Sequence, residues 1–253
     1  MNDPDHDAEE LARLLRDAFA SGAALSHWPS SVVPASAEGA YRVQQRLLQL
    51  RGQRAGGWKV GAKSGTGPIK GAPLPADGIQ ASPARLGRAR AVGLELEIAF
   101  RFGRAFAPSN RSYPSDEVIG GLASFCAAIE VVASRFAGWP DVDPLLQLAD
   151  LQNHGALVVG SFIDYDGGFA FASPSLRFGF NGHDIATDRP ANPAGDPRRL
   201  LAWAVNHCTT RGLRFEEGTI VTTGSYTGLH LVQGSGTAEG QIAGLPPVRL
   251  SLD

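Results

Sequence analysis

Short apolar runs separated by glycine and proline dominate the chain from Trp58 onward, and this pattern constrains the fold most. Apolar or alternating runs of this kind, bounded by turn-forming residues, are typical of β-strands. The expected strands are WKVGA, LELEIAFRF, ALVVGSFI, TIVTTGS, LHLVQG and PVRLSL, with a shorter one near SLRFGF. Most of the chain is therefore predicted to be β-rich.

The first fifty residues have a helical periodicity instead. Apolar residues from Ala8 to Phe19 recur at helical spacing and Gly22 supplies a stop, so an amphipathic helix is expected there. Ser36 can cap a second helix, after which several glycines break the chain. These patterns predict an N-terminal helical region over residues 1–57 and a β-rich domain over residues 58–253.

Two further helices are predicted to interrupt the strands. One follows Pro114 and Ser115 and continues through DEVIGGLASFCAAIEVV. The other is opened by Asp196 and Pro197, because a capping residue is followed there by the residue best tolerated at the first helical position. This second helix is expected to end at Gly212.

Charge and hydropathy exclude several kinds of partner. A formal net charge of -2 and a pI near 6.3 provide no basic surface for a nucleic-acid backbone. The acidic N-terminus lacks the positive start and apolar run of a secretory signal, and no apolar run is long enough to span a membrane. We therefore expect a cytoplasmic protein whose partners are small molecules.

Three glycine-containing motifs do not support common catalytic classes. GWKVGAKS has Ala62 where a phosphate-binding loop needs a glycine, so nucleotide hydrolysis is not predicted. GSGTAEG, from Gly234 to Gly240, lies between two strand-like runs, which favours a hairpin turn over a dinucleotide-binding site. GSYTG has its serine one position too early for the nucleophile of a serine hydrolase.

The stretch VGLELEIAF places two carboxylates at alternate positions of a predicted strand. Successive side chains of a strand point to opposite faces, so Glu95 and Glu97 share one face and lie roughly 7 Å apart. One interpretation is a solvated outer face. The other is a pair of ligands for a hard divalent cation such as Mg²⁺.

Other charged residues also lie in apolar surroundings. Glu130 interrupts the run FCAAIEVVA in the helix predicted after Pro114, so it is either on an exposed stripe or buried and paired. Metal binding would supply that pairing. Lys59 and Asp150 stand among apolar and glycine residues, where capping or ion pairing is the alternative to a role in chemistry.

Six blocks in order resemble the 2-keto-4-pentenoate hydratase family, within the wider fumarylacetoacetate hydrolase superfamily. They are AYRVQ, GWKVGAKS, GLELEIAF, AAIEVVASR, LADLQNHGALVVG and LLAWAVNHCTTRGLRFEEGTIVTTGSYTG. Each block is weakly specific alone, whereas the ordered set is specific. The resemblance implies an α+β fold, in which a mixed and highly curved β-sheet or roll has helices outside it and a helical region before it.

The same resemblance implies a metal site and its chemistry. Glu95, Glu97 and Glu130 match three carboxylates that hold Mg²⁺ or Mn²⁺, two from the strand and one from the helix after it. Such an ion leaves positions for water and for a chelating 2-oxo acid, and its Lewis acidity stabilises an enolate. A 2-hydroxy-2,4-dienoate could then ketonise and accept water at its fourth carbon.

Proton transfer needs a positioned acid and base. The resemblance points to Lys59 and to Asp77 in PLPADGI, and His154 is a third candidate for a catalytic role. The positions implied to bind the substrate are Ser64, Ser225 and Thr227. The loop KSGTGPIKGAPLPADG is shorter than is usual in the family, which leaves the substrate open.

A metal-dependent hydratase acting on a 2-hydroxyalka-2,4-dienoate is the leading hypothesis, and it is expected to act as a homo-oligomer. A 2-oxo-3-enedioate decarboxylase is the nearest alternative, which an additional cation at the far end of the pocket would favour. An acylpyruvate-type hydrolase would need a His and Glu pair that activates water. The non-enzymatic alternative is an inactive metal-binding subunit of a partner decarboxylase or hydratase.

Overall fold

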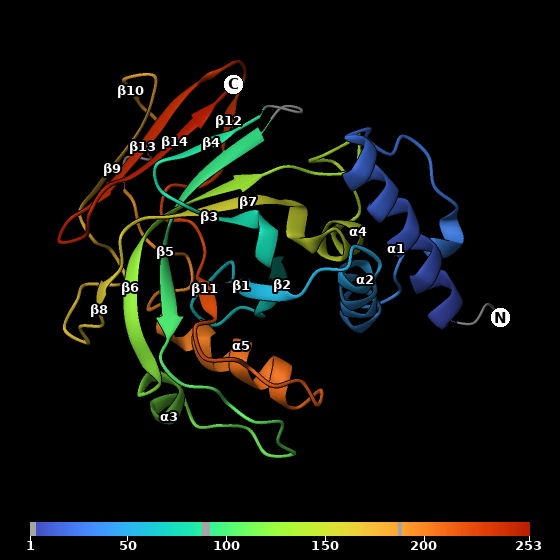
Figure 1. The fold of residues 1–253 in the computed structure, drawn as a ribbon, viewed down its shortest axis with the longest axis horizontal. Coiled ribbons are helices and arrows are strands. Elements are labelled where there is room, and N and C mark those ends of the chain that lie inside the picture. The colour runs from blue at the N-terminus through green and yellow to red at the C-terminus, as the bar shows by residue number, and fades with distance from the viewer. Residues whose placement is uncertain (1–3, 88–91, 187–188) are drawn as a thin grey trace.

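The computed structural model describes residues 4–87, 92–186 and 189–253, in which two mixed β-sheets have helices on one side and at one end (Figure 1). The predicted α+β class with a mixed sheet is therefore confirmed. The helices on one side are α1 (Pro4–Ser21), α2 (Ala37–Leu50) and α4 (Pro144–Ala149), and those at one end are α3 (Ser115–Ile119) and α5 (Arg198–Thr209). Short 3-10 turns are η1 (Ser30–Val32), η2 (Ala76–Gly78) and η3 (Leu151–Asn153).

The larger sheet carries the residues of the predicted site. Its main path has the order β2-β1-β11-β5-β6-β7-β3, while β12 pairs with β5 and β8 pairs with β6. The pairs β1 with β11 and β3 with β7 are parallel, and the others are antiparallel. These strands are β1 (Ala55–Gly61), β2 (Lys70–Pro75), β3 (Ile79–Ala81), β5 (Val92–Phe102), β6 (Leu122–Val132), β7 (His154–Val159), β8 (Ile163–Asp164), β11 (Ile220–Thr222) and β12 (His230–Val232).

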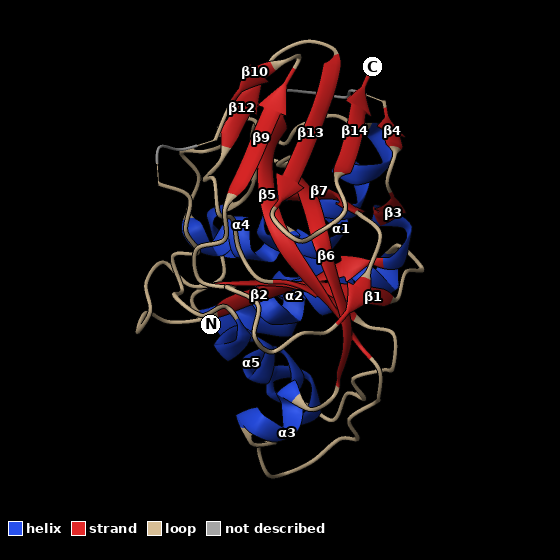
Figure 2. Ribbon diagram, turned by 90° about the vertical axis from the view of Figure 1, so that its left-hand side faces the viewer, coloured by secondary structure: helices blue, strands red, loops and turns tan. Residues whose placement is uncertain are grey.

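A second sheet has the order β10-β9-β13-β14-β4. Figure 2 shows it at one end of the molecule, with α3 and α5 at the other end. Apolar side chains of both sheets contribute to one hydrophobic core, including Leu96 of β5 and Val248 of β14, which are fully buried. Its strands are β4 (Ala84–Leu86), β9 (Leu176–Phe180), β10 (His183–Asp184), β13 (Gly236–Ile242) and β14 (Val248–Leu252).

The N-terminal helices form where the sequence predicts them. Ser36 caps α2 by accepting a hydrogen bond from the Gly39 amide at 3.2 Å. A second hydrophobic cluster joins both helices to the segment after β6, with Leu15 of α1 and Leu47 of α2 packed in the same cluster as Phe136 and Leu146. The helical pair therefore buries its apolar face against the segment that leads into α4 and β7.

The helix predicted through DEVIGGLASFCAAIEVV is wrong for most of its length. Only Ser115–Ile119 is helical; two glycines follow, and Leu122–Val132 is strand β6. The sequence run lacks alternation because β6 lies between β5 and β7 and is buried on both faces. A strand covered on both faces reads as a continuous apolar run, which periodicity alone does not separate from a buried helix.

The turn predicted for GSGTAEG is also wrong in part. Gly236–Ile242 is strand β13, which pairs with β14 on one side and β9 on the other. Glycine is needed here because the two sheets approach closely: a Cβ on Gly240 would lie 2.4 Å from Leu96 Cδ1. None of the helices in the described ranges is both long and apolar enough to cross a membrane.

The parallel pairing of β1 with β11 holds Lys59 in position, so a substitution that disturbs this pairing tests the fold around the site. A Cβ on Gly57 would lie 2.5 Å from the backbone oxygen of Ile220, which cannot move without breaking the ladder. We expect Gly57→Ala to lower the free energy of unfolding by about 1 to 3 kcal/mol, measured by urea denaturation. Gly61→Ala, on the same strand, is the control because no described atom beyond its chain neighbours lies within 4 Å of the new Cβ. Equal stability of the two variants would contradict this account.

Candidate metal centre

Three carboxylates converge because two long strands pair in a particular register. Glu95 of β5 lies directly opposite Glu130 of β6, so both side chains point to the same face of the sheet. Glu97 lies two residues along β5 and shares that face. One carboxylate oxygen from each glutamate lies within 4.8 Å of the other two. The structure therefore brings together the three predicted ligands, and Glu130 reaches the site from a strand rather than from the predicted helix.

Two of the three carboxylates are buried. Glu97 is 2% and Glu130 is 1% exposed, whereas Glu95 is half-buried. Glu130 Oε2 has no hydrogen-bond partner among the described residues, although a buried acceptor without a partner is costly. This donor set of buried, converging oxygens fits a hard divalent cation such as Mg²⁺ or Mn²⁺. The solvated-face interpretation of Glu97 is therefore wrong.

A turn after β11 supplies one hydrogen bond to this cluster. The Gly224 amide donates to Glu97 Oε2 at 3.0 Å, which leaves the other oxygen for a ligand. Gly224 has a φ of +88°, a conformation that glycine adopts without strain. The Asn192 side-chain amide fixes the same turn by donating to the carbonyls of Thr223 and Gly224 at 2.8 and 3.2 Å.

Lys59 enters the same site from strand β1, which lies next to the edge strand β2. Its Nζ forms an ion pair with Glu130 and donates to the backbone oxygen of Gln152 at 3.1 Å. Burial alone would lower the pKa of Lys59, but the attraction of Glu130 and Glu95 outweighs it and raises that pKa. Lys59 is therefore an ammonium group held beside the carboxylates.

The pKa values of the three glutamates are shifted in different directions. Burial, reinforced by Glu130, raises the pKa of Glu95 to about 7, and it raises the pKa of Glu97 well above its usual value. Burial also acts to raise the pKa of Glu130, but Lys59 and His154 outweigh it, and that pKa is lowered. Without a cation, the cluster is thus stabilised by one ammonium group and by protons on the remaining carboxyls. A divalent cation would displace those protons.

A cavity of about 760 Å³ opens onto the carboxylates. The charged and hydroxyl side chains in its lining belong to Lys59, Lys63, Lys70, Glu95, Glu97, Glu130 and Ser225. Gln152 and several glycine, proline and apolar residues complete the lining. This volume suits a small organic molecule. The charged side chains in its wall supply both an anionic centre and a proton donor.

The other predicted catalytic residues lie outside this lining. His154 is 1% exposed, and its Nδ1 lies 3.5 Å from Glu130 Oε1, so it touches the back of a ligand carboxylate. Burial lowers the pKa of His154 despite the neighbouring Glu130. Asp77 is exposed in η2, with its Oδ2 3.4 Å from Arg51 Nη2. The structure does not bring Asp77 to the cavity.

The three residues predicted to bind the substrate lie in different surroundings. Ser225 lines the cavity, and its Oγ donates to the Gly228 carbonyl at 3.2 Å. Thr227 is buried behind it, where its Oγ1 accepts a hydrogen bond from the Leu96 amide at 3.2 Å. Ser64 is exposed and is absent from the lining. Ser225 is thus the one predicted hydroxyl residue in the cavity wall, and Thr227 supports the metal-bearing strand.

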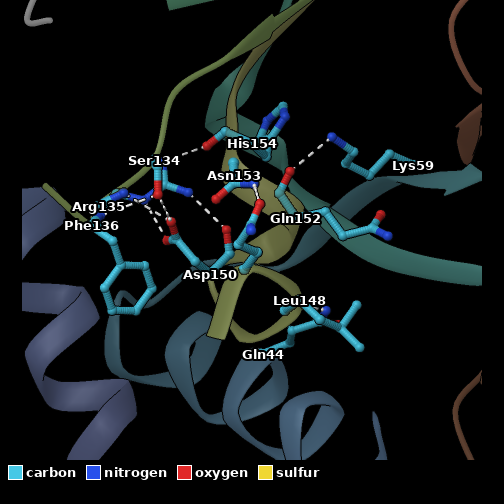
Figure 3. A network of polar contacts seen from close by, with 11 residues as sticks. Gln44, Lys59, Ser134, Arg135, Phe136, Leu148, Asp150, Gln152, Asn153 and His154 are labelled. Carbon is cyan, nitrogen blue, oxygen red and sulfur yellow. Dashed lines mark hydrogen bonds and ion pairs between the residues drawn. The ribbon is translucent and has the colours of Figure 1, made fainter. Parts of the chain in front are cut away.

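A buried ion pair holds the segment that faces Lys59 (Figure 3). Asp150 Oδ2 accepts from the Arg135 amide at 2.8 Å and from Ser134 Oγ at 3.2 Å, while Arg135 Nη2 and Nη1 donate to the carbonyls of Asp150 and His154 at 2.8 and 2.6 Å. Burial raises the pKa of Asp150 although Arg135 opposes the shift. Asp150 therefore has the ion-pairing role that the sequence allowed.

Gln152 is a site residue that the sequence did not identify. Leu151, Gln152 and Asn153 all have positive φ values, from 51° to 57°, which turns the Gln152 carbonyl toward Lys59. Non-glycine residues rarely adopt this conformation. The sequence signal is weak because a backbone carbonyl is the contacting group, and any side chain at position 152 provides one.

The raised pKa of Glu95 leads to a prediction about pH. Because its pKa is higher in the folded protein than its usual value of 4.5, the folded state favours the protonated carboxyl, and stability falls as pH rises from 4.5 to about 7. In EDTA, we expect Glu95→Gln to melt at a higher temperature than the parent, by a margin that grows from about pH 5 to about pH 8. Adding Mg²⁺ at the higher pH should stabilise the parent more than the variant.

Glu217→Gln is the matched control, because Glu217 is exposed and outside the cluster. Its difference from the parent should not change with pH or Mg²⁺. A pH-independent difference for Glu95→Gln would show that the Glu95 carboxyl is not held in its protonated form.

Comparison with known proteins supports the predicted resemblance, although no family model matches this sequence. A protein from Paraburkholderia phymatum named 2-keto-4-pentenoate hydratase is 27% identical over 259 residues, covering 98% of this chain and 98% of the relative. One of the same name from Burkholderia vietnamiensis is 26% identical over 260 residues, covering 97% of each. A solved structure of 4-oxalocrotonate decarboxylase from Pseudomonas putida G7, complexed with magnesium and adipate, has a TM-score of 0.84 at 18% identity and covers 98% of both chains. The resemblance is thereby confirmed: over almost the whole of the given sequence the chain is similar to proteins named 2-keto-4-pentenoate hydratase, and its fold is that of proteins in the fumarylacetoacetate hydrolase superfamily.

Proposed function

We propose that the protein is a divalent-metal-dependent lyase, a hydratase that adds water to a 2-hydroxyalka-2,4-dienoate to give a 4-hydroxy-2-oxo acid. The observation that carries the proposal is the convergence of Lys59 with Glu95, Glu97 and Glu130 on one cavity. Full-length similarity to proteins named as hydratases supports the same reaction.

Glu95, Glu97 and Glu130 would hold Mg²⁺ or Mn²⁺. The bound ion would supply Lewis acidity, which stabilises negative charge on the oxygen of an enolate. The protein supplies the geometry of the three ligands. Thr227 supports the strand between two of them through its bond to the Leu96 amide, and His154 lies against the third.

Lys59 is the group that moves a proton in this proposal. It is held as an ammonium by Glu130 and by the Gln152 carbonyl, and it lines the cavity. From this position its Nζ can donate a proton to the far carbon of the dienol as that dienol ketonises. The Ser225 hydroxyl can bind the substrate carboxylate and fix the chain relative to Lys59.

Decarboxylation of a 2-oxo-3-enedioate is the second candidate. It is supported by Lys63 and Lys70, which bring additional positive charge to the cavity. The fold is also similar to that of a 4-oxalocrotonate decarboxylase complexed with adipate, a dicarboxylate. Hydration is preferred because the full-length sequence similarity is to hydratases, whereas 18% identity supports a likeness of fold alone. Hydrolysis is less well supported, since His154 does not line the cavity.

The proposal includes assembly of the chain as a homo-oligomer, which sedimentation would measure. If the isolated protein shows no turnover, the alternative is that it is an inactive metal-binding subunit associated with a decarboxylase or hydratase. Intact Lys59 and the three glutamates favour turnover by this chain itself.

Lys59→Met tests whether the protein catalyses a reaction or only binds. The substitution removes the proton donor but keeps a side chain of similar length, so we expect turnover of a 2-hydroxy-2,4-dienoate to fall by about a hundredfold or more. Binding of Mg²⁺ and of a 2-oxo acid should remain measurable by calorimetry.

Arg54→Met is the control, because Arg54 is an exposed cation just before the same strand and outside the cavity. It should leave turnover unchanged. Full turnover in Lys59→Met would make Lys59 a structural ion-pair residue, and the proton donor would have to be sought elsewhere in the cavity.

A further inference from the structure

All the lysines of the chain lie in one place. Lys59, Lys63 and Lys70 are the three lysines among 23 lysine and arginine residues, and all three line the cavity of the metal centre. None of the described arginines lines it. An ammonium group is compact and sits on a flexible stem, whereas arginine presents a planar fork. The ammonium groups of the lysine side chains are thus confined to this one cavity.

Strand pairing places Lys70 on the cavity side. Lys70 begins β2 directly opposite Gly61 of β1, and residues opposite each other in an antiparallel pair share a face. Gly61 is two residues from Lys59 and therefore shares that face too. Because Gly61 has no side chain, Lys70 can extend over this position toward the cavity. Lys63 lies two residues beyond Gly61, in the loop that joins the two strands.

Lys63 and Lys70 differ from Lys59 in their ion pairing. Lys59 pairs with Glu130, but within the described ranges neither of the other two forms an ion pair. Exposed arginines elsewhere commonly do, as Arg85 does with Asp253 and Arg249 does with Glu239. Lys63 is exposed and Lys70 is half-buried, so both ammonium groups remain available to a ligand.

A second hollow of about 280 Å³ adjoins the cavity on the side of these lysines. It shares Lys63, Lys70, Pro144 and Gln152 with the cavity, and its lining also includes Gln147, Leu148 and Asn153. A ligand that is anchored at the glutamates could therefore continue past Lys59 into a region of uncompensated positive charge. The buried end of the site is anionic and suits a cation, whereas the outer end suits an anion.

We propose that Lys63 and Lys70 bind a second carboxylate at the distal end of the substrate, so that the substrate is an unsaturated diacid rather than a monoacid. The inference rests on the proposed function, because the first carboxylate and the neighbouring keto or enol oxygen must occupy the metal centre. It applies equally to hydration and to decarboxylation. Two ammonium groups flanking the outer end would discriminate against a substrate that ends in a methyl group.

The test uses two inert ligands of equal chain length, 2-oxoadipate and 2-oxohexanoate, which differ in the distal carboxylate. In the presence of Mg²⁺, calorimetry should show that the parent protein binds the diacid at least about tenfold more tightly than the monoacid, which corresponds to about 1.4 kcal/mol. Lys63→Gln and Lys70→Gln should each reduce this preference, and the double variant should abolish it. Affinity for the monoacid should stay within about twofold.

Two controls separate a specific contact from a general loss of charge. Arg54→Gln removes one exposed positive charge outside the cavity and should leave the preference unchanged. Lys70→Arg keeps the charge and should retain most of the preference. Far-ultraviolet circular dichroism and a thermal melt check that each variant is folded.

The outcomes distinguish this inference from the proposed function. If the parent binds both ligands equally and only with Mg²⁺, the chelating site stands and the second carboxylate site is wrong. If the parent prefers the diacid and the lysine variants keep that preference, the assignment to Lys63 and Lys70 is wrong. If neither ligand binds with Mg²⁺, the proposed function fails and this inference fails with it.

Discussion

The register of β5 against β6 is the constraint on which the rest of the site depends, because it sets Glu95 directly opposite Glu130. Like charges at such a position destabilise a sheet. Two carboxylates about 5 Å apart would repel by on the order of 3 kcal/mol even at an effective dielectric constant of 20, and Glu97 adds further repulsion. The repulsion is reduced because Lys59 supplies one positive charge and the raised pKa of Glu95 favours its protonated, neutral form. A divalent cation would supply the missing charge.

A second buried arrangement holds the other wall of the site. The ion pair between Arg135 and Asp150 satisfies its own charges and also fixes the backbone from residue 150 to residue 154. Three consecutive left-handed residues follow Asp150, and such backbone persists only where surrounding contacts determine it. The result is a carbonyl directed at Lys59 and an imidazole placed behind Glu130. The Arg135–Asp150 ion pair does not line the cavity, yet it positions the Gln152 carbonyl against Lys59 and the His154 imidazole against Glu130.

Much of this fold could be predicted from local patterns, and the errors have physical causes. Helical periodicity and the Ser36 cap identified α1 and α2, and alternation identified β5. The pattern failed for β6, where burial on both faces removes alternation, and for β13, where glycines allow close sheet packing. It also missed β2, in which Pro73 and Pro75 weaken the strand signal although an edge strand tolerates proline.

The three carboxylates were predictable as a group because each is a charge within an apolar run, and the resemblance linked them. Their meeting depends on strand register, which no local pattern shows. The contributions of Gln152 and Gly224 are backbone groups, so side-chain identity carries little information about them. Asp77 was expected at the site because of its motif, but tertiary packing places it on the surface beside Arg51.

The most direct measurement of the central claim is the location of the metal. Crystals grown with Mn²⁺ and measured at a wavelength where manganese scatters anomalously would identify the ion independently of its ligands. We expect one strong anomalous peak per chain, roughly 2 Å from a carboxylate oxygen of each of Glu95, Glu97 and Glu130. A peak at another position, or saturating Mn²⁺ with no peak between these three residues, would contradict it.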